Sequence, residues 1–170
     1  FLTASGQKIE LRKVMVEMSF YEDIYNFVVS GHLTILDAQG FSELLTLTGN
    51  EFIEVNFSKT PNQVNGINRT FRVYKAGPRI PTGNMNVEVY PLYFCSEELL
   101  LSEQSKVGKS YKGKKISEIV TNILTDNDVT GKLRVNSNRI EKIEETLGIY
   151  DFVVPKLKPL EAISWLSNYA

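Results

Sequence analysis

The first hundred positions are dominated by an alternation of apolar and polar residues. Apolar side chains mostly alternate with charged ones from Gln7 to Met18, with one slip in phase between Leu11 and Val14. Successive side chains of a strand point to opposite faces, so this pattern predicts a strand with a bulge at the slip. A β-branched run over residues 27–36 predicts a second strand, and the interruption at 19–24 predicts a short helical corner between the two.

The following segments alternate strand patterns with turn residues. They predict a helix of one or two turns over 37–48, strands over 51–57, 70–75 and 85–95, a loop over 60–68 and turns between 77 and 83. Five or six strands at this spacing are typical of a small antiparallel barrel or sandwich. We therefore predict a β-barrel domain up to about residue 100.

Helical spacing enters in the last third of the chain. Apolar residues recur at i, i+3, i+4, i+7 and i+8 from Ile116 to Leu124, which predicts an amphipathic helix. The other expected elements are a polar, basic linker over 105–115, a loop over 126–131, short strands over 132–135 and 149–154, and a last helix opened by Pro159. The predicted fold class is α+β, mainly β: an antiparallel β-barrel followed by the start of a smaller α/β domain.

Charge and cysteine usage narrow the possible environments and partners. Nineteen Lys and Arg oppose 20 Asp and Glu, so no strong field draws the chain to nucleic acid or anionic lipid. No apolar run reaches the roughly 18 to 20 residues that span a bilayer, and we expect a soluble protein without a membrane partner. Cys95 is the single cysteine, which excludes an internal disulfide and fits a reducing cytoplasm. The chain stops at Ala170 within a helical pattern, so we expect it to be part of a longer protein.

Two segments imitate known ligand-binding loops but lack essential residues. Gly108-Lys109-Ser110 resembles the end of a phosphate-binding loop, but the glycine required five residues earlier is Glu103. Asp126, Asp128, Thr130 and Gly131 resemble half of a calcium-binding loop, whose twelfth position should be glutamate and is Ser137. We interpret the first as a solvated linker and the second as an ordinary connection.

Catalytic constellations are also incomplete. His32 is the single histidine, and a relay through it would need Asp37 or Glu43 as its orienting acid and a nucleophile that nothing positions. Cys95 has no activating base in view, the acid pairs Glu97-Glu98 and Glu144-Glu145 fit solvated surface, and the glycosylation pattern at 68–70 fits chance. We expect no catalytic residue, no cofactor-binding residue, no metal ligand and no cofactor, and we expect that the protein is not an enzyme.

Aromatic residues offer one binding alternative. The chain has eight Tyr, nine Phe and one Trp, and Phe71-Arg72-Val73-Tyr74-Lys75 interleaves rings with cations. Such a strand could stack single-stranded nucleic acid. Phe71 and Val73 share one face while Arg72 and Tyr74 share the other, which is equally typical of a half-buried strand.

Four stretches carry a resemblance to a known family: Phe20–Ile35, Phe71–Lys75 with Tyr93–Glu98, Val107–Val120, and Lys158–Leu166. Together they resemble the tail hub proteins of contractile-tailed phages, the family of the T-even baseplate hub and its relatives in other injection machines. The resemblance implies that residues 1–103 form a β-barrel tube domain. It implies that residues 104–170 begin an inserted α/β domain, incomplete at its C-terminus.

The same resemblance implies a structural role in the virion. The expected protein is a homotrimer, assembled in the host cytoplasm, that joins the tail tube protein to the central spike protein and contacts other baseplate subunits. DNA is expected only as passing cargo. Two alternatives stay open: a binding module that uses a sheet face for carbohydrate or single-stranded nucleic acid, and a hydrolase, which would need an acid pair or a metal site.

Overall fold

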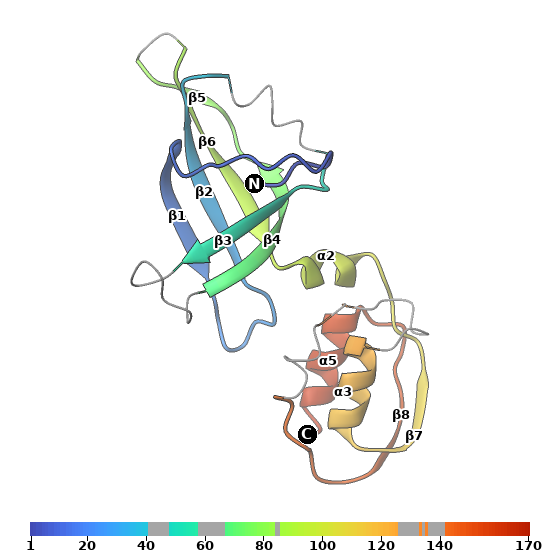
Figure 1. The fold of residues 1–170 in the computed structure, drawn as a ribbon. Coiled ribbons are helices and arrows are strands. Elements are labelled where there is room, and N and C mark those ends of the chain that lie inside the picture. Colours follow the sequence, from blue (N-terminus) through green and yellow to red (C-terminus); the bar gives the residue numbers. More distant parts are fainter. Residues whose placement is uncertain (41–47, 58–66, 84–85, 126–132, 134, 136–141) are drawn as a thin grey trace. The chain divides into compact units, whose positions relative to one another are not determined.

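The computed structural model describes residues 1–40, 48–57, 67–83, 86–125, 133, 135 and 142–170. Its contacts group the chain into two units, Phe1–Ser96 and Glu97–Ala170 (Figure 1). The fold class is α+β and mainly β, as the sequence predicts. The assignment of residues 1–103 and 104–170 to a tube domain and an inserted domain stays a prediction.

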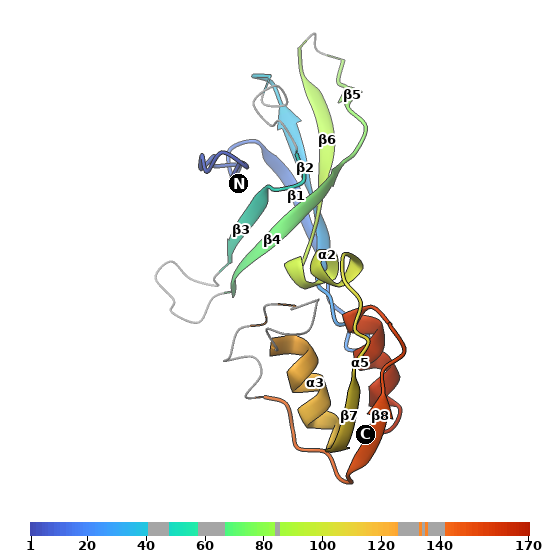
Figure 2. The same cartoon turned by 90° about the vertical axis from the view of Figure 1, so that its right-hand side faces the viewer.

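An antiparallel sheet of six strands forms the first unit. The strands are β1 (Met15–Tyr21), β2 (Ser30–Asp37), β3 (Phe52–Phe57), β4 (Ile67–Ala76), β5 (Ile80–Pro81) and β6 (Glu88–Cys95). Their order is β1-β2-β6-β4-β3, and β5 pairs with the start of β6. The sheet curls into a half-barrel whose edge strands are β1 and β3 (Figures 1 and 2).

Inward-facing side chains of β2, β3, β4 and β6 build the core of this unit. Alternate positions on each strand are buried: Leu33, Ile35, Ile53, Val55, Phe71, Val73, Tyr90, Leu92 and Phe94. Full burial of one such side chain contributes about 1.5–3 kcal/mol. The alternation that predicted strands therefore also separates the core face from the outer face.

The N-terminal segment covers part of the open side of the half-barrel. Leu2 exchanges two backbone hydrogen bonds with Phe52 at the start of β3, with N···O distances of 2.7 and 3.0 Å. Leu11 is buried in the core, and Ile9 packs against it. The strand predicted over residues 7–18 therefore starts only at Met15, because the preceding apolar side chains fill the core from a non-strand segment.

The predicted helical corner at 19–24 is wrong, because residues 19–21 belong to β1 and residues 22–24 are not helical. β1 continues to Tyr21 because Phe20 packs on Phe71 and Phe94, with ring centroids 5.6 and 5.4 Å away. A register irregularity occurs between Met15 and Glu17, later than the predicted slip.

The remaining predictions for this region have mixed outcomes. The strands predicted over 51–57, 70–75 and 85–95 are confirmed as β3, β4 and β6, with shifted ends. The short strand β5 was not predicted. Of the helix predicted over 37–48, residues 38–40 are not helical and 41–47 lie outside the described residues, as does most of the loop predicted over 60–68.

Helices and a two-stranded ribbon form the second unit. Its elements are α2 (Glu97–Glu103), β7 (Ser110–Lys114), α3 (Ile116–Thr125), β8 (Tyr150–Val153) and α5 (Pro159–Ser167). α3 and α5 lie side by side next to the β7–β8 ribbon (Figures 1 and 2). The amphipathic helix is confirmed, because Ile116, Ile119 and Ile123 are buried against Ala162, Ile163 and Leu166 of α5.

Three details of this unit differ from the sequence prediction. Residues 110–114 of the predicted linker form β7, whose Tyr111 enters the core. α2 was not predicted. Leu133 and Val135 are not in a strand, and the other residues of the strand predicted over 132–135 lie outside the described part.

Gly31 of β2 is closely packed between the backbone of β1 and the Phe94 ring of β6. A Cβ at this position would contact the Ser19 carbonyl oxygen and would lie 2.6 Å from the Phe94 ring, so Gly31→Ala must displace backbone or a core ring. We expect it to lower the free energy of unfolding of the first unit by about 1–3 kcal/mol. Gly83→Ala is the control, because no described atom beyond its chain neighbours lies within 4 Å of a Cβ added there.

Hydrogen–deuterium exchange of peptides from β2 and β6 measures this loss. Trp165, the single tryptophan, lies in the second unit, so its fluorescence on urea unfolding should report an unchanged second unit. Equal protection of β6 in the Gly31→Ala and Gly83→Ala variants would contradict the close packing.

Candidate functional site

The structure does not bring His32 and Asp37 together. His32 lies on the outer face of β2, where its Nδ1 is 3.3 Å from the Tyr21 hydroxyl. Asp37 is buried on the core side, five positions along the same strand, and its Oδ1 accepts a hydrogen bond from the Gln39 backbone at 3.1 Å. An odd spacing on a strand places two side chains on opposite faces, which separates the proposed relay. Glu43 lies outside the described residues.

Gly108-Lys109-Ser110 is extended chain rather than a phosphate-binding loop. Ser110 begins β7 opposite Val153, and the Lys109 carbonyl accepts a hydrogen bond from the Val154 amide at 2.9 Å. Because α3 begins only at Ile116, the backbone amides here do not converge on a helix N-terminus.

The other sequence candidates do not form a reactive cluster. Cys95 is fully buried, Glu97 and Glu98 lie in the first turn of α2, and Glu145 pairs with Lys115 at 2.6 Å. The pattern at 68–70 lies in β4. Residues 126, 128, 130, 131 and 137 of the calcium-like loop lie outside the described part of the chain.

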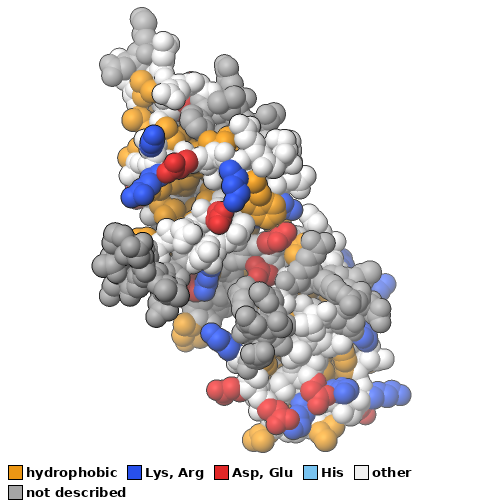
Figure 3. Space-filling view, in the orientation of Figure 1, with side chains coloured by type: hydrophobic (Ala, Val, Ile, Leu, Met, Phe, Trp, Pro, Cys, Tyr) orange, Lys and Arg blue, Asp and Glu red, His pale blue; other side chains and the backbone are white. Residues whose placement is uncertain are grey.

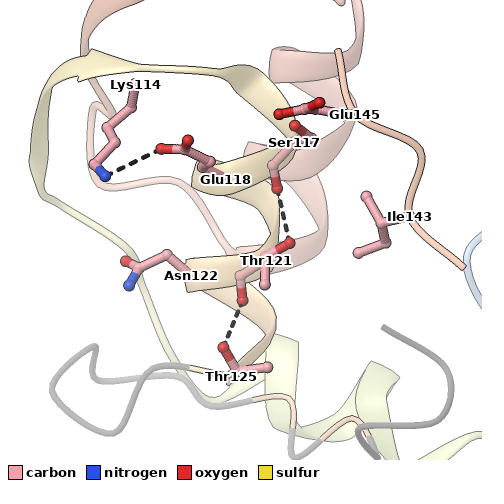
Figure 4. Close-up of a pocket in the computed structure, with 8 residues that line it drawn as sticks. All are labelled: Lys114, Ser117, Glu118, Thr121, Asn122, Thr125, Ile143 and Glu145. Carbon is pink, nitrogen blue, oxygen red and sulfur yellow. Dashed lines mark hydrogen bonds and ion pairs between the residues drawn. The ribbon is translucent and has the colours of Figure 1, made fainter. Parts of the chain in front are cut away.

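A polar groove of about 400 Å³ runs beside α3 (Figure 4). The Thr121 hydroxyl donates to the Ser117 carbonyl at 2.8 Å, and the Thr125 hydroxyl donates to the Thr121 carbonyl at 2.7 Å. Lys114 pairs with Glu118 at 3.0 Å. The threonine hydroxyls of this groove thus bond to the backbone of their own helix, and its charges are paired. Among its described lining residues, this groove is polar helix surface and places no nucleophile beside a base.

Aromatic side chains cross the outer face of the six-stranded sheet. Ring centroids are 6.0 Å apart between Tyr21 and His32, 6.1 Å between His32 and Tyr93, and 6.3 Å between Tyr93 and Tyr74. The four residues come from β1, β2, β6 and β4, which are consecutive in the sheet. We call them the aromatic stripe. They are the largest arrangement of clustered, solvent-accessible rings that we find on the described part of the first unit.

An open groove of about 540 Å³ follows the aromatic stripe. Ser30 and Thr34 of β2 and Ile80 of β5 line it together with the rings. Desolvation, and then the neighbouring Cys95 and Tyr93, raise the pKa of the Tyr74 hydroxyl, so Tyr74 stays neutral. Lys75 lies at the rim, with its Nζ 5.5 Å from the Tyr93 ring centroid.

The sequence pattern indicated the strand that carries Tyr74 as a possible stacking surface, but it did not indicate the other three residues of the aromatic stripe. It marked the strand around Tyr74, but Phe71 is buried in the core and is not available to stack a ligand. The pairing of His32 with Tyr93 depends on the β2–β6 register, which joins residues about 60 positions apart. Periodicity within one strand gives no information on that pairing, although it does place His32 and Tyr93 opposite to the apolar face of their strands.

Comparisons with known proteins do not assign the chain to a family. A scan of the chain against protein-family models finds no match, and a search of curated proteins finds none either. Within the described residues, no helix is both long and apolar enough to cross a bilayer.

Two buried polar side chains of the first unit, Glu51 and Tyr90, have shifted pKa values. Glu51 accepts hydrogen bonds from the Thr48 amide, the Thr48 hydroxyl and the Gly49 amide, at 2.8, 2.7 and 2.9 Å. Burial acts to raise the pKa of Glu51, but these hydrogen bonds act in the opposite direction and the net pKa is lowered. Burial, and then the charge of Asp37, raise the pKa of Tyr90 to about 12.

Glu51→Gln should weaken the first unit. The amide removes the charge that three donors share, and we expect a loss of about 1–3 kcal/mol of unfolding free energy at neutral pH. Because the folded-state pKa of Glu51 is lowered, the stabilisation by the carboxylate is complete above the unfolded pKa of about 4.3 and is lost as pH falls through the folded pKa.

Hydrogen exchange of β3 and β4 peptides as a function of pH checks this expectation. The wild type should lose protection in the acid range more steeply than Glu51→Gln. Glu54→Gln is the matched control, because Glu54 is exposed on β3, which begins directly after Glu51, and pairs with Lys8 at 3.6 Å. Parallel pH profiles for wild type and Glu51→Gln would contradict the assigned role.

Proposed function

We propose that the protein is a structural subunit of a phage tail baseplate hub, a trimeric adaptor that joins the tail tube to the central spike. The observation that carries this proposal is the half-barrel of the first unit, whose apolar interior opens between its two edge strands. The resemblance of the sequence to tail hub proteins supplies the identity of the assembly.

The open side of the half-barrel has two hollows that the described residues of the chain leave accessible. One, of about 750 Å³, is lined by residues of the N-terminal segment, β1, β2 and β3. The other, of about 320 Å³, is mainly apolar and includes Phe20, Val55 and Phe57. The ion pair of Arg69 with Glu22, at 3.6 Å, lies at its rim. Hydrophobic side chains show between charged ones on this face (Figure 3).

Exposed apolar side chains also gather at the β1–β2 connection. Ile24 is 91 % exposed and Tyr25 is 88 % exposed. The connection has defined geometry, because Asp23 Oδ1 accepts a hydrogen bond from the Tyr25 amide at 2.9 Å and Asn26 Oδ1 accepts one from Val28 at 3.2 Å. Exposed apolar clusters of this kind mark protein–protein contacts.

The edge strands of the sheet and the near-neutral charge of the chain fit a subunit of a symmetric ring through which DNA passes. An unpaired edge offers backbone donors and acceptors to a second chain, and a symmetric ring repeats that contact. The formal charge of -1 gives no strong attraction to a polyanion, so DNA could move through such a ring without being held.

The mass of the full-length protein in solution, with and without its spike protein, tests the proposal. Light scattering should give a trimer, or a monomer that becomes three copies on the spike. A monomer that does not bind the spike would overturn the hub proposal.

Phe57→Lys should disrupt that assembly. Phe57 is 60 % exposed at the open side, so a lysine there costs the folded monomer little but would place a charge in an apolar interface. We expect loss of the trimer by light scattering at unchanged thermal stability. Asn68→Lys, at an exposed position of the neighbouring strand β4 that lines neither hollow, is the matched control and should assemble normally. A Phe57→Lys variant with wild-type mass would exclude this side from the interface.

A further inference from the structure

The aromatic stripe lies on the face of the sheet opposite to the core, so no part of the core requires it. Tyr21 is 56 % exposed and Tyr74 is 49 % exposed, and they stand at the two ends of the stripe. His32 and Tyr93, between them, face each other directly in the β2–β6 register. Four neighbouring strands of a rigid sheet thus hold four rings in fixed positions.

The groove along the stripe combines ring faces with hydrogen-bonding groups. The Tyr21 hydroxyl and His32 Nδ1 form one polar pair at 3.3 Å, and the hydroxyl-bearing residues Ser30 and Thr34 line the same groove. Amphipathic aromatic side chains suit ligands that have one apolar face and a polar periphery. Sugar rings have this character, because their C–H groups form a face and their hydroxyls point outward.

Charge distinguishes a sugar from a nucleic acid as the ligand. The described residues that line the groove include no Lys, Arg, Asp or Glu. A single-stranded nucleic acid needs a cationic groove that follows its phosphates as well as rings that stack its bases. Lys75 at the rim is one cation beside the stripe, and Glu17 lies on β1 opposite Thr34, so the surroundings are of mixed sign. An uncharged ligand fits this surface better than a polyanion.

We propose that the outer face of the six-stranded sheet binds a neutral oligosaccharide along Tyr21, His32, Tyr93 and Tyr74. Sugar rings stack on the tyrosines at the ends of the groove, and their hydroxyls bond to the Tyr21–His32 pair and to the serine and threonine of β2. This binding is separate from the assembly proposed above, because it uses the opposite face of the sheet from the open side of the half-barrel.

Calorimetric titration of the full-length protein tests this site. The probes are cellotetraose and the β-1,4-linked tetramer of N-acetylglucosamine, two neutral oligosaccharides, with an oligothymidylate as the charged comparison. We expect saturable binding of at least one oligosaccharide and weaker binding of the oligothymidylate. Tyr74→Ala should weaken the oligosaccharide by about tenfold, the effect of losing about 1.4 kcal/mol of stacking.

Three further variants separate stacking from folding defects. Tyr74→Phe keeps the ring and should bind within a few-fold of wild type, whereas Tyr93→Ala should bind as weakly as Tyr74→Ala. Tyr25→Ala removes an exposed tyrosine away from the stripe and should bind like wild type. Thermal unfolding of each variant confirms that it is folded before its affinity is compared.

The outcomes distinguish this site from the hub interface. Phe57→Lys should bind oligosaccharide normally, and Tyr74→Ala should keep the wild-type mass. Absence of saturable binding to both oligosaccharides, or equal affinity in wild type and Tyr74→Ala, overturns the proposal. Preferential binding of the oligothymidylate also overturns it and assigns the stripe to single-stranded nucleic acid.

Discussion

The pairing of β6 with β2 is the constraint on which the first unit depends. Eight residue pairs in continuous register join Ser30–Asp37 to Glu88–Cys95, and β4 and β5 then attach to the other edge of β6. This register places Leu92 and Phe94 in the core, and it places Tyr93 outside beside His32. A slip by one residue would exchange the two faces, so burial of the core also fixes the geometry of the aromatic stripe.

Local pattern predicted the elements whose periodicity and packing agree. α3 repeats its apolar face over three turns, and β3 alternates between buried and exposed positions, so both were predicted close to their observed bounds. The sequence-based predictions for the N-terminal segment and for β7 were wrong because tertiary contacts, and not local periodicity, determine the structure of these two segments. Leu11 fills the core from outside any strand, and the polar run of β7 becomes a strand because it pairs with β8, whose residues lie about 40 positions later.

Candidate chemistry was predictable only as far as one strand determines it. His32 and Asp37 are close in sequence, yet their odd spacing sends them to opposite faces, as strand parity alone indicates. Gly108-Lys109-Ser110 resembles a phosphate loop in residue type but lies in paired extended chain. The aromatic stripe needs four strands in one register, and no pattern within a single strand contains that information.

The two faces of the sheet carry different kinds of surface, and this difference limits what each can contact. The open side is mainly apolar, lies between the edge strands β1 and β3, and is bounded by charges such as the Arg69–Glu22 pair, which suits another protein chain that brings its own backbone. The groove on the outer face crosses β1, β2, β6 and β4, and the described residues that line it are aromatic or uncharged. Because this groove offers ring faces and hydroxyl-bearing side chains, it suits a ligand that stacks on rings and bonds to hydroxyl groups. One curled sheet can therefore take part in an assembly and retain a second surface for a different ligand.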